Sequence, residues 1–165
     1  DEGTRFEIRF PSKSLKASKP EDQSISPSID SGAMKRETES AGKKKIKLLL
    51  VDDEIKFAKV LFKRLSKRNM DVTTAFSGEE AIQALRRVDF DAAVLDLKMP
   101  DMDGLEVLKI FKKMYPKMEV IILSGHDSEQ SAREGMEYGA FDYLAKPCDI
   151  EHLIDTIRKS ISARR

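Results

Sequence analysis

The strongest constraint on the fold is an alternation of strand-like and helix-like segments from residue 46 to the end of the chain. Strand-like segments fall at residues 46–51, 71–75, 92–95, 120–123 and 141–144, of which the first is a short apolar run and the second is weaker. Apolar residues recur at the spacing of one helix face over about residues 55–65, 78–87, 105–111, 127–138 and 150–161. Five such units predict an α/β fold in which helices cover both faces of a parallel sheet.

The composition is typical of one soluble domain. Of the 165 residues, 40% are hydrophobic, and no run reaches the about 20 apolar residues that cross a bilayer. Thirty basic and 29 acidic residues leave no strongly basic footprint for nucleic acid. The only cysteine, Cys148, cannot form an internal disulfide, and we interpret it as a small half-buried hydrophobe. We therefore expect a cytoplasmic protein with no membrane contact and no direct contact with nucleic acid.

The first 45 residues have a different character. Residues 12–45 are rich in Ser, Lys, Glu and Pro without an apolar period, which predicts a flexible linker. In residues 1–11, Phe6, Ile8 and Phe10 alternate with charged residues up to Pro11, as in a half-buried strand. We interpret this segment as the end of an upstream domain or as accidental alternation. Part of residues 31–34 could instead derive from a cloning vector.

Polar side chains follow four of the five expected strands at the point where each strand ends. In order these are Asp52 and Asp53, then Asp96, then Ser124, then Lys146 with Pro147. Functional groups of open α/β sheets gather at this carboxyl edge. Three carboxylates, a hydroxyl and an ammonium are therefore predicted to converge there.

Taken singly, these residues have ordinary structural explanations. Asp53 or Ser124 could cap the next helix, and Lys146 could form a surface ion pair worth about 0–1 kcal/mol. Taken together they are harder to explain, because two unit charges about 4 Å apart repel by about 4 kcal/mol at an effective dielectric of 20. Clustered carboxylates call for a cation, and carboxylate and carbonyl oxygens suit Mg²⁺, which shares its shell readily with phosphate oxygens.

Four segments carry a family resemblance: LLLVDDE (48–54), DLKMPDMDG (96–104), VIILSG (120–125) and GAFDYLAKP (139–147). In this order and spacing they resemble the receiver domain of two-component response regulators, over residues 46–165. The resemblance implies a doubly wound, flavodoxin-like sheet of five parallel strands in the order 2-1-3-4-5. It also implies a phosphoryl group received from a histidine kinase or a histidine phosphotransfer protein.

The resemblance gives each residue of the edge a role. Asp96 would be the phosphoacceptor, taking the group from phosphohistidine. Asp53, Asp96 and the backbone carbonyl of Lys98 would ligate Mg²⁺, with Asp52 holding a coordinating water. Lys146 would pair with one phosphoryl oxygen and the Ser124 hydroxyl would donate to another. Such a module catalyses its own phosphorylation and dephosphorylation, whether or not it belongs to a larger enzyme.

The resemblance further implies a switch. Ser124, drawn toward the phosphoryl group, would vacate space that the aromatic ring of Tyr143 fills. The downstream partner would then bind the face built by the fourth helix, fifth strand and fifth helix. A tyrosine packed at the strand edge with no switching role is the alternative.

Four other positions have smaller implied roles. The Lys146–Pro147 bond would be cis, and Gly104 would serve the backbone geometry of the turn beside Asp96. Lys98 and His126 would flank the path of the hydrolytic water and tune the lifetime of the phosphoryl group.

The parent protein is a separate question. GTRFEIRFP (3–11) resembles the last strand of the ATP-binding domain of sensor histidine kinases. With a linker and a terminal receiver, this predicts a hybrid histidine kinase, and a free-standing single-domain response regulator is the alternative. A Mg²⁺-dependent aspartyl phosphatase or phosphotransferase on a small substrate, a degenerate receiver that only binds, and a nucleic-acid-binding regulator are competing classes. Against the first stands the missing Asp-x-Asp pair at the acceptor, and against the last stand the balanced charge and the chain end after the fifth helix.

Overall fold

A computed structural model describes residues 42–125 and 129–164 of the chain. Within them, five strands form one parallel sheet in the order β2-β1-β3-β4-β5, which confirms the predicted fold class. The strands are β1 (Ile46–Val51), β2 (Met70–Ala75), β3 (Ala92–Leu95), β4 (Glu119–Ser124) and β5 (Asp142–Ala145).

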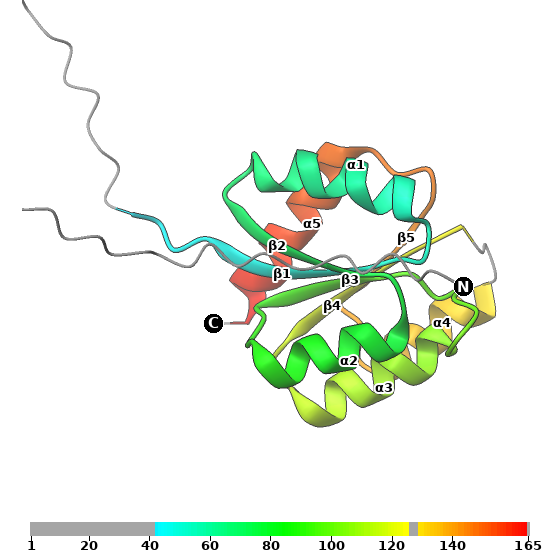
Figure 1. Ribbon diagram of the computed structural model, residues 1–165. Coiled ribbons are helices and arrows are strands. Elements are labelled where there is room, and N and C mark those ends of the chain that lie inside the picture. The colour runs from blue at the N-terminus through cyan, green and yellow to red at the C-terminus, as the bar shows by residue number, and fades with distance from the viewer. Residues whose placement is uncertain (1–41, 126–128, 165) are drawn as a thin grey trace, which may run out of the picture. The chain divides into compact units, whose positions relative to one another are not determined.

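Five helices cover the two faces of this sheet: α1 (Ile55–Ser66), α2 (Gly78–Arg87), α3 (Gly104–Met114), α4 (Glu129–Glu137) and α5 (Ile150–Ala163). α1 and α5 lie on one face, and α2, α3 and α4 lie on the other (Figure 1). Along β1, Leu48 and Leu50 belong to the core under α1 and α5, whereas Leu49 and Val51 belong to the core under α2 and α3. Burial on both faces explains why residues 48–51 of this strand are all apolar.

Side-chain caps start three of the helices close to the strands. Ser77 accepts a hydrogen bond from the Glu80 amide at α2, Asp103 from the Leu105 amide at α3, and Asp149 from the Glu151 amide at α5. Such caps satisfy amides that the first turn of a helix leaves without an internal partner. None of the helices in residues 42–125 and 129–164 is long and apolar enough to cross a membrane.

Some predicted boundaries were wrong by one or two residues. β2 begins at Met70, β4 extends to Glu119 and Ser124, and β5 covers Asp142–Ala145 instead of residues 141–144. Phe141 still donates its amide to the Val120 carbonyl at 2.7 Å, so pairing starts just before the strand itself. Strand ends of this kind fray and are poorly marked by side-chain pattern.

The apolar face of α1 is narrower than predicted. Ala58, Leu61 and Leu65 are buried, but Ile55 and Phe62 are 48% and 40% exposed. The predicted helix over residues 127–138 is observed as Glu129–Glu137, and residues 127 and 128 lie outside the described residues, as does the whole segment 1–41.

Gly104 fixes the turn after β3 through a close backbone approach. Its amide donates to the Leu97 carbonyl at 3.0 Å. A Cβ at this position would lie 2.4 Å from the Leu97 Cα and 2.6 Å from the Asp96 carbonyl oxygen. Both neighbours are backbone atoms of the turn after β3. Any side chain at position 104 would therefore displace the backbone of Asp96 and Leu97.

We expect Gly104→Ala to lower the free energy of unfolding by about 1–3 kcal/mol, the usual cost of overpacking a site that cannot give way. Urea denaturation measures the change. Gly42→Ala is the matched control, because a Cβ at position 42 meets nothing within 4 Å. Equal stabilities of the two variants would contradict the close approach.

Candidate functional site

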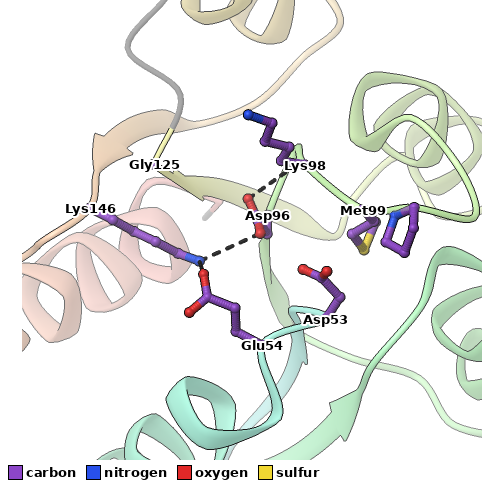
Figure 2. A pocket seen from close by; sticks show the side chains of 8 residues that line it. Asp53, Glu54, Asp96, Lys98, Met99, Gly125 and Lys146 are labelled. Carbon is purple, nitrogen blue, oxygen red and sulfur yellow. Dashed lines mark hydrogen bonds and ion pairs between the residues drawn. The ribbon is translucent and has the colours of Figure 1, made fainter.

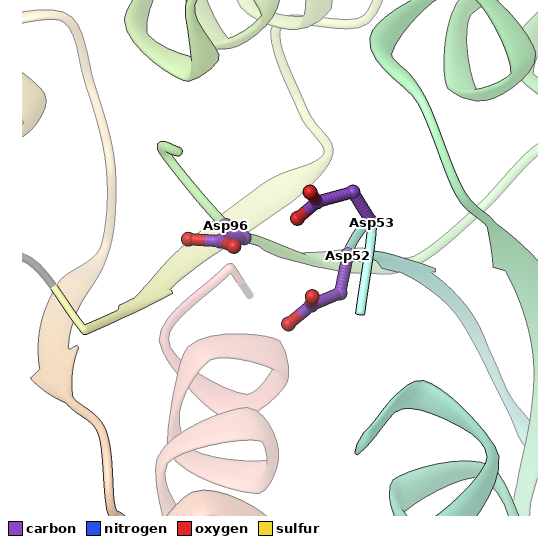
Figure 3. A group of neighbouring side chains, drawn as sticks. All are labelled: Asp52, Asp53 and Asp96. Atoms are coloured by element: carbon purple, nitrogen blue, oxygen red, sulfur yellow. The ribbon is translucent and has the colours of Figure 1, made fainter. Parts of the chain in front are cut away.

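Three carboxylates meet at the carboxyl edge of the sheet. Asp52 and Asp53 directly follow β1 and Asp96 directly follows β3, and these strands are neighbours. One oxygen from each carboxylate lies within 4.8 Å of the others (Figure 3). Asp52 and Asp96 are only 2% and 4% exposed, so their mutual repulsion is poorly screened by water. Three oxygens held this closely could bind a metal ion.

Lys146 reaches this cluster from the loop after β5. Its Nζ lies 2.6 Å from Asp52 Oδ2, 3.5 Å from Asp96 Oδ2 and 3.8 Å from Glu54 Oε1. Figure 2 shows the side chain pointing from its loop toward Asp96 and Glu54. The Lys146 amide donates to the Ser124 carbonyl at 2.9 Å, and the bond to Pro147 is cis, as the resemblance implies. The loop therefore aims one ammonium at three carboxylates.

Burial and neighbouring charges shift the pKa values of Asp52 and Lys146. Burial raises the pKa of the Asp52 carboxyl above its usual value, although the hydrogen bond from Lys146 opposes that shift. Burial by itself would lower the pKa of Lys146, but the hydrogen bond and charge of Asp52, with the charges of Asp96 and Glu54, raise the pKa overall. Lys146 is thus an ammonium at neutral pH, and a single positive charge faces several negative ones.

Backbone amides orient two of the three carboxylates. The Glu54 amide donates to Asp52 Oδ1 at 2.9 Å, and the Lys98 amide donates to Asp96 Oδ1 at 3.2 Å. Asp53 has no hydrogen bond or ion pair to any other residue in the described ranges. The carboxylate oxygens of Asp53 are therefore available to a cation, whereas Asp96 Oδ2 already lies 3.5 Å from the Lys146 ammonium.

The cluster opens into a pocket of about 450 Å³. Its walls are Asp53, Glu54, Asp96, Lys98, Met99, Pro100, Gly125 and Lys146. The Lys98 side chain points away from the Asp96 carboxylate, and the Lys98 backbone amide makes the contact with Asp96 (Figure 2). His126, expected to border the same space, lies outside the described residues. The pocket is wide enough to admit a tetrahedral anion to Asp96.

Ser124 and Tyr143 lie on the same face of the sheet. Tyr143 pairs with Ile122, and both side chains belong to the core under α2 and α3. Ser124 follows Ile122 by two positions along β4, so strand alternation turns its buried side chain to that face too. Tyr143 is only partly buried. The two residues predicted to act together thus lie on the same face of adjacent strands, two positions apart in the register.

Contacts of Lys146 and of Asp101 at the site were not predicted from the sequence. Lys146 also meets Glu54 and the ring of Phe57, both near the start of α1. Asp101 accepts hydrogen bonds from the Gly78 and Glu79 amides, which ties the loop after β3 to the first turn of α2. The signal for Glu54 and Phe57 was available, since a helix that starts two residues after Asp53 must border the same edge.

The doubly wound parallel sheet places this chain among the open α/β proteins, which bind their ligands at the carboxyl edge of the sheet. The acidic cluster and Lys146 lie at that edge. Residues 48–158 match the family described as "Response regulator receiver domain". The chain belongs to this family.

Individual relatives support the same assignment. The transcriptional regulatory protein ZraR of Salmonella typhimurium is 34% identical over 121 residues, which are 73% of this chain and 27% of ZraR. The chain therefore spans about a quarter of that relative's length. The receiver domain of Francisella response regulator 1452 is 35% identical with a TM-score of 0.69, over 73% of this chain and all of that one. A response regulator protein from Burkholderia pseudomallei, solved with a phosphorylated aspartic acid, calcium ion and citrate, is 26% identical with a TM-score of 0.67, over 72% and 70%.

Removing one charge from the cluster should stabilise the protein when no metal is bound. We expect Asp53→Asn to raise the free energy of unfolding in EDTA by about 1 kcal/mol, because it relieves like-charge repulsion without breaking a hydrogen bond. Millimolar Mg²⁺ should then raise the melting temperature of the wild type and raise that of Asp53→Asn much less.

Thermal and urea unfolding, each with EDTA and with Mg²⁺, measure both effects. Asp89→Asn is the control, because Asp89 is an exposed carboxylate outside the cluster. Equal Mg²⁺ responses of wild type and Asp53→Asn would count against a metal site at these residues.

Proposed function

We propose that residues 46–165 are a phosphoacceptor receiver that takes a phosphoryl group from phosphohistidine onto Asp96 with the help of Mg²⁺. The observation that carries the proposal is the meeting of Asp52, Asp53 and Asp96 with the Lys146 ammonium at the edge of one pocket. The structure of the Burkholderia relative, with its phosphorylated aspartic acid and calcium ion, supports the same chemistry in this family.

The geometry suits an in-line transfer. An Asp96 carboxylate oxygen attacks the phosphorus, the new O–P bond forms as the N–P bond to histidine breaks, and the electron pair returns to the imidazole nitrogen. Lys146, 3.5 Å from Asp96 Oδ2, would pair with a phosphoryl oxygen, and the Ser124 hydroxyl would donate to another. The protein's contribution is mainly positioning and charge neutralisation, as in phosphoryl transfer generally.

The acidic residues fit a small divalent cation. Asp53, Asp96 and the Lys98 carbonyl would hold Mg²⁺, and Asp52 would hold one of its waters. The oxygen-only donor set is what Mg²⁺ prefers. When bound, the ion neutralises negative charge on the carboxylates and on the incoming phosphoryl group. Asp52 lies 2.6 Å from Lys146, and a carboxylate already paired with an ammonium fits an outer role toward the ion.

Signalling would follow from Ser124 and Tyr143. If Ser124 moves toward a phosphoryl group on Asp96, space opens on the face of the sheet that Tyr143 shares. Rotation of the half-buried tyrosine ring into that space would alter the surface of α4, β5 and α5, where a downstream partner would bind.

The setting in a larger polypeptide stays a prediction. The hybrid histidine kinase is the first hypothesis, with segment 1–11 as a kinase remnant and 12–45 as linker, and the phosphoryl donor a histidine kinase or phosphotransfer protein. The alternative is a response regulator of its own, as the name of ZraR suggests for that relative. A kinase ATP-binding domain encoded upstream of Asp1 would support the first. A cytoplasmic location stays a prediction of both.

With acetyl phosphate and Mg²⁺, we expect the wild type to gain about 80 Da, the mass of one phosphoryl group, because Asp96 is the buried carboxylate that the pocket exposes to a donor. Asp96→Asn should gain nothing, and the control Asp89→Asn should behave as the wild type. Intact-mass spectrometry measures the change. Hydrolysis of a small phosphate ester in steady turnover, lost in Asp96→Asn, would favour a phosphatase instead.

Tyr143→Ala should accept the phosphoryl group at a rate within about twofold of the wild type, since its ring does not line the acceptor pocket. It should at the same time reduce the phosphorylation-dependent shift of backbone amide NMR signals in α4, β5 and α5. Tyr138→Ala is the control, an exposed aromatic just beyond α4. A Tyr143→Ala variant that cannot be phosphorylated would refute this separation of acceptance from signalling.

A further inference from the structure

The Lys146 ammonium has an aromatic neighbour besides the carboxylates of Asp52, Asp96 and Glu54. Its Nζ lies 4.3 Å from the centroid of the Phe57 ring. Phe57 is in the first turn of α1 and packs against the core under α1 and α5. The ring is therefore held by the core and is partly buried, so the contact does not depend on a mobile surface side chain.

The surroundings make this contact strong for its kind. A cation within about 6 Å of an aromatic centroid is attracted by the negative face of the ring, and the attraction grows when the cation is desolvated. The Lys146 side chain is only 12% exposed, whereas Glu54, its most distant carboxylate partner, is 66% exposed. Because Phe57 is partly buried and Glu54 is exposed, water screens the contact with the ring less than the contact with Glu54.

The ring also differs from the carboxylates in how it holds the charge. The 2.6 Å bond to Asp52 is directional and fixes the ammonium beside that residue, 3.5 Å from Asp96. Attraction to a ring face changes little with the direction of the N–H bonds. An ammonium over Phe57 can therefore turn its donors from Asp52 toward a group on Asp96 without losing this contact.

We propose that Phe57 is a positioning residue of the acceptor site, whose ring confines the Lys146 ammonium and lets it shift toward a phosphoryl group on Asp96. The inference rests on the proposed function, because the shift matters only if Asp96 accepts a phosphoryl group. An aliphatic side chain at position 57 would exclude water equally well but would not attract the ammonium.

The test compares initial rates of phosphorylation by acetyl phosphate with Mg²⁺. Phe57→Leu should be slower by about three- to tenfold, the range expected for a partly desolvated cation–π contact. Phe57→Tyr keeps the ring face and should restore a rate within about twofold of the wild type. Phe62→Leu is the matched control, because Phe62 is an exposed phenylalanine of the same helix, and its rate should be that of the wild type.

Two further measurements separate the ring face from packing. In NMR spectra the ε-methylene protons of Lys146 should show an upfield ring-current shift in wild type and Phe57→Tyr, lost in Phe57→Leu. A trifluorinated phenylalanine at position 57 keeps the size of the ring but weakens its negative face, and should slow phosphorylation as Leu does. This variant keeps the test decisive if Phe57→Leu fails to fold.

The outcomes are distinct. An active wild type with equally fast Leu and trifluorinated variants overturns this inference alone, as do Leu and Tyr variants that are equally slow. A wild type that takes up no phosphoryl group overturns the proposed function and this inference together. Slow Leu and trifluorinated variants beside a fast Tyr variant support the ring as the positioning element.

Discussion

Three carboxylates approach one another closely at the ends of β1 and β3, and their repulsion opposes folding when no cation is bound. Parallel pairing of these strands places Asp52, Asp53 and Asp96 within reach of a single ion, and burial of two of them removes the water that would screen them. A fold selected for stability alone would separate these charges. Under the proposed function, a divalent cation bound among these carboxylates offsets their repulsion.

The positive charge of Lys146 partly offsets this repulsion, and several contacts hold its ammonium beside Asp52 and Asp96. A cis peptide, a hydrogen bond from its own amide to Ser124 and the ring of Phe57 all act on one side chain. Removing a partner from a buried ion pair leaves an uncompensated charge, so loss of the Lys146 ammonium would destabilise the metal-free protein. The same ammonium would have to change partners when a phosphoryl group arrives, which is why its confinement matters.

The sheet and its carboxyl edge could be predicted from the sequence, because apolar runs at residues 48–51 and 92–95 are each followed directly by aspartate. Local pattern did not reveal that Ile55 and Phe62 of α1 are exposed, since helical spacing cannot tell how wide the buried stripe is. The start of α1 two residues after Asp53 indicates that Glu54 and Phe57 border the same edge. Their distances to Lys146 depend on how α1 packs against the loop after β5, and no short-range pattern encodes that packing. The roles of the site residues came from the family resemblance and remain proposals.

The most direct measurement of the central claim is a titration of the chain with Mn²⁺, followed by paramagnetic broadening of backbone amide signals. We expect substoichiometric Mn²⁺ to broaden first the signals of Asp52, Asp53, Asp96 and Lys98, and excess Mg²⁺ to restore them. The Asp53→Asn variant should need a far higher Mn²⁺ concentration for the same broadening. Broadening spread evenly over the acidic surface, or unchanged in Asp53→Asn, would contradict a metal site at the meeting of β1 and β3.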